Sequence, residues 1–144
     1  MKKSSIVLVT IIAFLAVGGM IIAWSAYQKG GQPPGQLRIK KFTDDNFQQE
    51  VVEASRTRPI VVDFYAEWCY PCSLLDHTLK EVAQDLEGRV VIGKVDTDRN
   101  LIARQFGIKR IPAVFIIRNG EIKTAFYGVV PKEKLLEALK EFGA

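Results

Sequence analysis

Residues 60–72 read IVVDFYAEWCYPC, a stretch that joins a strand-like run to two cysteines separated by two residues. Residues 60–65 are mostly β-branched and aromatic, which is typical of a strand buried on both faces. From Cys69 onward, apolar residues recur at helical spacing until Gly88, namely Leu74, Leu75, Leu79, Val82, Ala83 and Leu86. The sequence therefore predicts that Cys69 occupies or precedes the first turn of a helix.

The segments on either side extend an alternation of strands and helices. Upstream, Thr43 can cap a helix that runs through Phe47, Val51 and Val52. Downstream, residues 90–96 have the composition of a strand and residues 100–106 that of a short helix. These segments predict layers of helices packed on a sheet.

The C-terminal part predicts a hairpin and a final helix. Asn119-Gly120 separates the strand-like runs 113–118 and 121–127, and this dipeptide tolerates positive φ at both positions of a two-residue turn. Pro131 suits the first turn of a helix with one apolar stripe, which consists of Leu135, Leu136, Leu139 and Phe142. The predicted order is β-α-β-α-β-α-β-β-α, an α/β fold with a mixed central sheet flanked by helices.

Residues 6–23 are apolar except for Thr10, and a helix of this length spans about 27 Å, near the thickness of the hydrocarbon layer. Trp24 and Tyr27 follow as residues suited to the headgroup layer. We expect residues 1–26 to form an N-terminal transmembrane helix, with a cleaved signal sequence as the alternative. Under either interpretation the rest of the chain is exported across the membrane. Lys2 and Lys3 should stay cytoplasmic by the positive-inside rule. The expected location is a single-pass membrane protein whose folded domain lies on the extracytoplasmic (periplasmic or cell-surface) side.

Residues 27–36, YQKGGQPPGQ, cannot bury an apolar face and are predicted to be a flexible linker, so the folded domain comprises residues 37–144. The chain carries 20 Lys and Arg, of which Lys2, Lys3 and Lys29 precede Leu37, leaving 17 against 16 Asp and Glu. Their signs are interspersed and form no basic stripe. Nucleic-acid binding is therefore not expected.

A chemically reactive role explains the cysteine pair better than a stabilising disulfide does, because the loop between the two cysteines is too short to restrain the unfolded chain much. A zinc site needs about four ligands, but the chain offers only Cys69 and Cys72, with His77 as its sole imidazole, so no metal is expected. A helix N-terminus lowers the pKa of a cysteine that faces it, which makes Cys69 the expected nucleophile. Cys72, one turn deeper, would be the resolving cysteine. Inert core cysteines are the alternative.

At these residues the sequence resembles the thioredoxin family, in which Trp-Cys-X-Pro-Cys follows the central strand. Ile111-Pro112 resembles that family's cis-proline loop, residues 118–121 its hairpin, and Gly128 the glycine before its last helix. The resemblance covers residues 37–144. It implies a thioredoxin-like fold and a thiol–disulfide oxidoreductase with no cofactor beyond a redox-active Cys69–Cys72 disulfide.

The resemblance also assigns roles to two charged residues. Asp63 lies inside an apolar strand, where desolvation should raise its pKa, and its family counterpart exchanges a proton with the resolving cysteine. An aspartate satisfied by backbone groups at the strand end is the alternative. Lys94 matches a lysine thought to interact with that aspartate, or else it is an ordinary charge at the end of the sheet.

The expected substrate-binding residues surround the cysteines. The family match implies a cis bond before Pro112, which would leave the backbone of Ile111 to bind an extended substrate strand. Without that match, a trans turn would be expected. Trp68, Tyr70 and Pro71 would flank the substrate, although Trp68 and Tyr70 can also be read as ordinary exposed aromatics.

The sequence departs from the family pattern at Tyr70, Ser73 and His77, where the family often has a glycine, a lysine and a proline. The sequence therefore does not determine the redox potential. The leading hypothesis is a reductase of protein disulfides that receives electrons from a membrane partner protein, with cytochrome c maturation as one use. The alternatives are a disulfide-forming oxidase or isomerase, and a non-catalytic binding module with vestigial cysteines.

Overall fold

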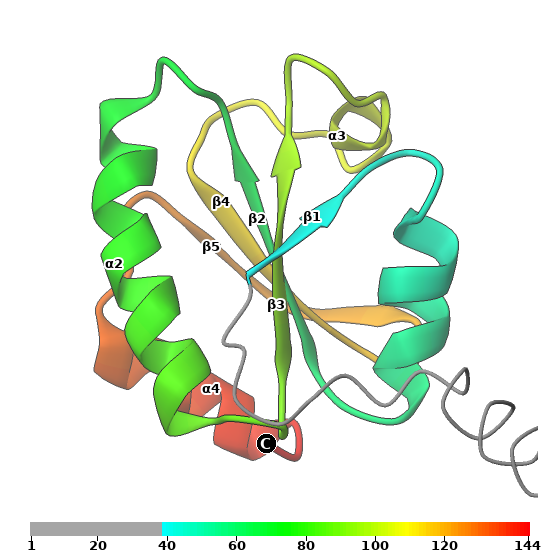
Figure 1. The fold of residues 1–144 in the computed structure, drawn as a ribbon, viewed down its shortest axis with the longest axis vertical. Coiled ribbons are helices and arrows are strands. Elements are labelled where there is room, and N and C mark those ends of the chain that lie inside the picture. The colour runs from blue at the N-terminus through cyan, green and yellow to red at the C-terminus, as the bar shows by residue number, and fades with distance from the viewer. Residues whose placement is uncertain (1–38) are drawn as a thin grey trace, which may run out of the picture. The chain divides into compact units, whose positions relative to one another are not determined.

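The computed structural model describes residues 39–144, which form one five-stranded mixed sheet with helices on both faces (Figure 1). The strands lie in the order β1-β3-β2-β4-β5, with β3 parallel to β1 and β2, and β4 antiparallel to β2 and β5. Their bounds are β1 Lys40–Phe42, β2 Ile60–Tyr65, β3 Val91–Asp96, β4 Ala113–Arg118 and β5 Glu121–Tyr127. The helices are η1 Gln48–Glu53, η2 Ala54–Arg56, α2 Tyr70–Asp85, α3 Ile102–Gln105 and α4 Lys132–Glu141. The predicted thioredoxin-like α/β fold with a mixed sheet is confirmed.

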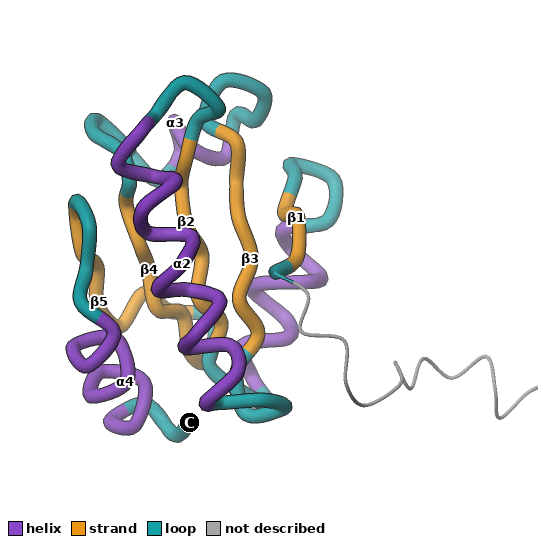
Figure 2. The backbone as a smooth tube through the Cα atoms, turned by 60° about the vertical axis from the view of Figure 1, so that its left-hand side comes forward, coloured by secondary structure: helices purple, strands orange, loops and turns teal. Residues whose placement is uncertain are grey.

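The helices α2 and α4 cover one face of the sheet, and η1 and α3 lie against the other (Figure 2). Successive side chains of the central strand β2 point alternately to the two layers, as the pleat requires. Val61 therefore packs toward α2 and α4, whereas Ile60, Val62 and Phe64 pack toward the η1 side. Asp63 shares the face of Val61, which directs its carboxyl group toward α2.

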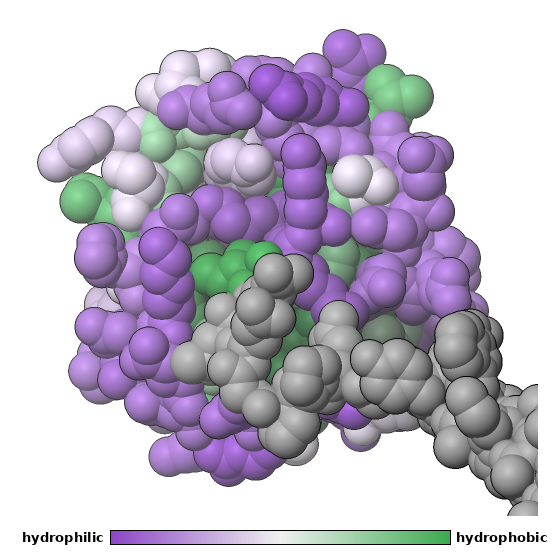
Figure 3. Space-filling model, in the orientation of Figure 1, coloured by the Kyte–Doolittle hydropathy of each residue, from purple (hydrophilic) through white to green (hydrophobic). Residues whose placement is uncertain are grey.

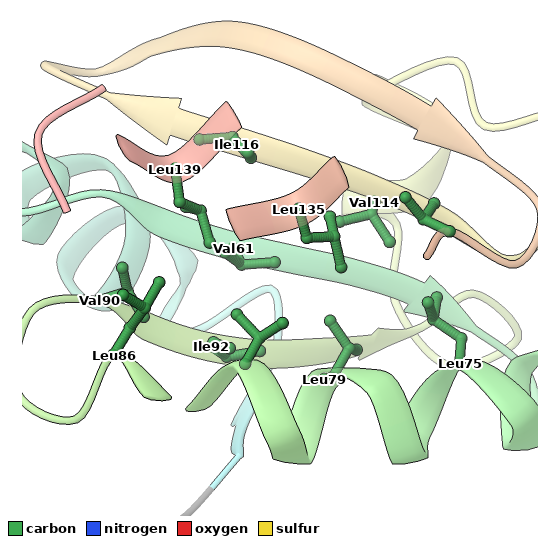
Figure 4. Packing of buried hydrophobic residues seen from close by; sticks show 12 residues of the cluster. Val61, Leu75, Leu79, Leu86, Val90, Ile92, Val114, Ile116, Leu135 and Leu139 are labelled. Carbon is green, nitrogen blue, oxygen red and sulfur yellow. The ribbon is translucent and has the colours of Figure 1, made fainter. Parts of the chain in front are cut away.

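The core under α2 explains why that helix forms where its apolar residues recur (Figure 4). Leu75, Leu79 and Val82 are fully buried, and they meet Val61 from β2 and Leu135 from α4. Burying one such side chain contributes roughly 1.5–3 kcal/mol. Leu74 departs from the predicted stripe, because it stays 45% exposed on the outer side of α2.

The predicted hairpin is confirmed, with φ values of 58° at Asn119 and 76° at Gly120. Ser55 of η2 holds this turn: its carbonyl accepts the Asn119 N–H at 2.9 Å, and its hydroxyl oxygen accepts the Gly120 N–H at 2.8 Å. Ser55 is itself fully buried. The hairpin is therefore fixed by a contact between residues far apart in the sequence.

Two helix starts differ from the prediction. The Thr43 cap is wrong, because the capping residue of the π-helical η1 is Phe47, with no side-chain cap bond, and Thr43 takes part only through its carbonyl, which accepts the Phe47 N–H at 3.0 Å. Pro131 lies one position earlier than expected, since it is the cap of α4 with an extended backbone. A proline fits both positions because neither needs an intrahelical N–H bond.

The predicted anchor, residues 1–26, and the predicted linker, residues 27–36, lie outside the described residues. Within residues 39–144, no helix combines the length and the apolar character that crossing a membrane requires. The face of the domain seen in Figure 3 carries mostly hydrophilic side chains.

Candidate active site

The two cysteines form a disulfide at the N-terminus of α2, with their Cα atoms 5.3 Å apart. Cys69 is the capping residue of this helix, with φ −85° and ψ 101°, and its Sγ accepts the N–H of Cys72 at 3.3 Å. Pro71 sits in the first turn, where the missing N–H has no helical partner to lose. The predicted placement of both cysteines at a helix start is confirmed, and an N–H donor already points at the Cys69 sulfur.

The two cysteines differ little in exposure in this disulfide state. Cys69 is 6% exposed and Cys72 is 2% exposed, so both are buried. Ala66, Tyr65 and Ile111 pack around the pair. The position of Cys69 at the helix end, rather than its exposure, is what distinguishes it chemically.

Asp63 is fully buried, and neither of its carboxyl oxygens has a hydrogen-bond partner within the described part of the chain. Burial raises the pKa of this carboxyl group from 3.8 to about 7, with Lys94 opposing the shift and Asp76 adding to it. The alternative of an aspartate satisfied by backbone groups is therefore wrong. A carboxyl group with this pKa can take up or release a proton near neutral pH.

Lys94 lies beside Asp63 in the neighbouring strand, and the two residues are register partners. Its Nζ is 3.9 Å from Asp63 Oδ2, and it donates a hydrogen bond to Asp76 of α2. The same ammonium lies 4.1 Å from the centre of the Tyr65 ring. Lys94 is thus part of a charged cluster under α2 and not an ordinary charge at the end of the sheet. Sequence reasoning missed Asp76, whose position one helical turn after Cys72 was the available indication.

A groove of about 620 Å³ opens beside the disulfide, and Cys69 lies in its wall. Of the predicted substrate-binding residues, Trp68, Tyr70, Pro71 and Ile111 line it. The fifth, Pro112, is buried behind it, and its peptide bond with Ile111 is cis, as the family resemblance implied.

Trp68 and Tyr70 are 73% and 72% exposed, which leaves two aromatic faces for a ligand. The indole Nε1 of Trp68 donates to Asp98 Oδ2 at 2.8 Å, so one side of the Trp68 ring is fixed. Sequence reasoning missed Asp98 and four residues that line the groove, Thr97, Ile108, Lys109 and Arg110. The last three precede the cis bond directly, and that proximity could have identified them.

Across residues 39–144, no three His, Cys, Asp or Glu side chains gather closely enough to hold a metal ion. The chemistry that this site offers comes from the sulfur pair and the carboxyl group of Asp63.

Comparison with known proteins gives a consistent result. Residues 38–141 match the family model named Thioredoxin. Thioredoxin of Chlorobaculum thiosulfatiphilum is 37% identical over 69% of this chain and 91% of its own length. Thioredoxin 1 of a Nostoc species is 39% identical over 70% and 94%, and thioredoxin of Rickettsia bellii is 40% identical over 66% and 90%. With its cysteine pair at the start of α2, the chain belongs to the thioredoxin family of thiol–disulfide oxidoreductases.

Proposed function

We propose that this chain is a membrane-anchored reductase of protein disulfides that works on the extracytoplasmic side. The observation that carries the reductase proposal is Asp63, a buried carboxyl group with no hydrogen-bond partner in the described domain and a pKa of about 7, on the face toward α2. Oxidising a dithiol releases a proton from the resolving thiol, and a group of this kind can accept it.

The reaction begins with the reduced pair. The Cys69 thiolate attacks one sulfur of a substrate disulfide, so that a mixed disulfide forms and the other substrate sulfur leaves as a thiolate. The Cys72 thiol then gives its proton to Asp63 and attacks the Cys69 sulfur. The Cys69–Cys72 disulfide forms, the second substrate thiolate leaves, and two electrons have passed to the substrate.

The cysteine roles are tested by measuring reduction of insulin disulfides. Cys69→Ser should abolish turnover, whereas Cys72→Ser should still attack and accumulate the mixed disulfide, which a non-reducing gel detects. Leu74→Ser, an exposed position on the same helix, serves as the folding control. Insulin reduction at the parent rate by Cys69→Ser would disprove the assignment.

The direction of electron flow is tested by a redox titration against glutathione. A potential near that of thioredoxin, about −270 mV, supports reduction, whereas a value near about −120 mV identifies a disulfide-forming oxidase. Reduction outside the cytoplasm also requires a membrane protein that supplies electrons, because oxidised Cys69–Cys72 must be reduced again after each turnover.

The membrane location rests on the apolar run at residues 6–23 and on the lysines before it. We expect the full-length chain to remain in the membrane fraction after a high-salt wash. Protease added from outside should digest the domain while the membrane that holds residues 1–26 stays sealed. Recovery of the full-length chain in the soluble cytoplasmic fraction would contradict this location.

A further inference from the structure

The groove beside the disulfide combines exposed aromatic rings with two adjacent basic residues. Trp68 and Tyr70 form one part of its lining, and Lys109 and Arg110 form another. Both basic residues are exposed, and they directly precede Ile111 and the cis bond. A substrate segment that reaches Cys69 through this groove must therefore pass close to two positive charges.

These two charges are not neutralised within the described domain. Neither Lys109 nor Arg110 has a carboxylate within ion-pair distance there, whereas Arg99, which does not line the groove, pairs with Glu67 at 3.2 Å and with Asp96 at 3.3 Å. The groove lining itself contains no acidic residue. The Lys109–Arg110 side thus carries an uncompensated positive charge.

The orientation of Arg110 strengthens this point. Its guanidinium carbon lies 4.7 Å from the centre of the Tyr127 ring, so the planar group is supported on one face by an aromatic surface. Stacking of this kind leaves the N–H donors at the guanidinium edge available to a carboxylate. An arginine held in place also loses less side-chain freedom when it binds a carboxylate than a freely moving one does.

A carboxylate lies next to the Trp68 part of the groove, although it is not itself part of the lining. Asp98 accepts the hydrogen bond from Trp68 Nε1 at 2.8 Å and places a carboxylate beside that ring. An acidic substrate side chain is therefore repelled near Trp68 and attracted near Lys109 and Arg110. The charge distribution favours one position of an acidic residue along the groove over the other.

We propose that the preferred substrates are protein disulfides with an acidic residue close to the attacked cysteine, held by Lys109 and Arg110. This inference rests on the proposed reductase function and specifies its substrate class. The electron balance is unchanged: the Cys69–Cys72 dithiol is oxidised and the substrate disulfide is reduced. The two basic residues act by attracting and positioning the substrate and take no part in bond exchange.

The test uses three cystine peptides that differ only at the residues flanking the attacked cysteine, which are Glu, Gln or Lys. The full-length chain in mild detergent should reduce the Glu peptide with a kcat/KM about 1.4- to fivefold above the Gln peptide for each charge engaged, the range that exposed ion pairs give. Raising the salt concentration from about 50 mM to about 500 mM should remove most of the preference, because the charges are exposed. The Lys peptide should be the poorest substrate.

A double variant and a matched control locate the effect. Lys109→Gln with Arg110→Gln should bring the three kcat/KM values together. Lys134→Gln with Lys140→Gln removes the same total charge from α4, outside the groove, and should leave the preference intact.

Equal rates for the three peptides in the parent protein would overturn the substrate preference and leave the reductase function standing. An equal loss of preference in the α4 control would also overturn it, because net charge alone would then be responsible. Failure of the reduced parent protein to reduce any peptide would overturn the reductase function, and the substrate preference with it.

Discussion

Asp63 lies in the middle of β2 between apolar neighbours, and its environment makes the ionised form costly. In the unfolded chain such a group loses its proton near pH 3.8, but in the folded protein it does so only near pH 7. The folded state therefore holds one more proton than the unfolded state between these values. Stability falls as the pH rises through this window, because the unfolded state gains more from ionisation.

Asp63→Asn should remove this dependence on pH. The free energy of unfolding of the parent protein should fall relative to that of the variant by up to about 4 kcal/mol between pH 4 and pH 8. Urea unfolding of both proteins at a series of pH values measures the difference, and the remaining groups largely cancel because both proteins share them. Parallel stability profiles would show that Asp63 does not hold the extra proton.

Asp76→Asn should lower the pKa of Asp63. The carboxylate of Asp76 raises that pKa, and it also holds the Lys94 ammonium, so its loss both removes a negative charge and frees a positive one. The ¹³C chemical shift of the Asp63 carboxyl carbon, followed against pH, reports the change.

Asp85→Asn is the matched control for this experiment, because Asp85 belongs to the same helix but pairs with Lys132 at 2.9 Å. An unchanged titration of Asp63 in Asp76→Asn, or the same shift in both variants, would contradict the role of Asp76.

Some residues of the candidate site could be predicted from the sequence and others could not, for a physical reason. Asp63 stands out because a charge inside an apolar strand is unusual, and Cys69 because a strand leads into a helix at that point. Asp76 does not stand out, since an acidic residue on a helix is ordinary until the fold brings Lys94, 18 residues away, into contact with it. Contacts of this type depend on tertiary structure and carry no local pattern.

At the level of the elements, β1 and β3 approach each other closely at one glycine. Gly93 of β3 is the register partner of Lys40, and a Cβ atom added to it would lie 2.3 Å from the Phe42 ring. Phe42 is fully buried and packs edge-on against Phe47 at 6.3 Å, so its ring has little room to move. The absence of a side chain at Gly93 lets this short edge strand pack its phenylalanine over the sheet.

Gly93→Ala should lower the free energy of unfolding by about 1–3 kcal/mol, the usual cost of overpacking a core. Thermal or urea unfolding measures this loss. Combining it with Phe42→Leu should make the added methyl group less costly, because the smaller side chain leaves space. Additive effects of the two substitutions would show that the ring is not the obstacle.

Element boundaries followed local rules only in part. The hairpin at Asn119-Gly120 was predictable because both residues tolerate positive φ. The start of η1 was not, because this helix begins after Phe47 without any side-chain cap, while Asn46 bonds back to the Thr43 N–H and to the Lys41 carbonyl at 3.1 Å. A capping preference cannot locate a helix start that uses no side-chain cap.

For the whole molecule, the two hydrophobic clusters that flank the sheet are built from residues of the 37–144 domain. A chain that begins at Leu37 should therefore unfold in one cooperative transition and retain insulin reductase activity when reduced, since it contains both clusters and the cysteine pair. Circular dichroism during heating measures the first property and the insulin assay the second. A broad, non-cooperative transition would mean that residues before Leu37 contribute to the core.

The fold class followed from the alternation of patterns and from the family resemblance, whereas the groove followed only in part, because Thr97 and residues 108–110 of its lining were not predicted. Its lining comes from two separate segments after β2 and before β4, with Thr97 from a third. Strand order determines which loops meet at one end of a sheet. The order β1-β3-β2-β4-β5 cannot be inferred from the local pattern of any single segment.

The groove is made almost entirely of loop residues and the first turn of α2, while the sheet and its two apolar clusters lie beneath it. The residues that line the substrate groove and most of the residues that stabilise the fold therefore belong to different parts of the polypeptide. Because Lys109 and Arg110 are exposed and belong to neither apolar cluster, both can be exchanged to redirect the protein toward other substrates without repacking its interior, whereas Ile108 packs against the core and should be kept.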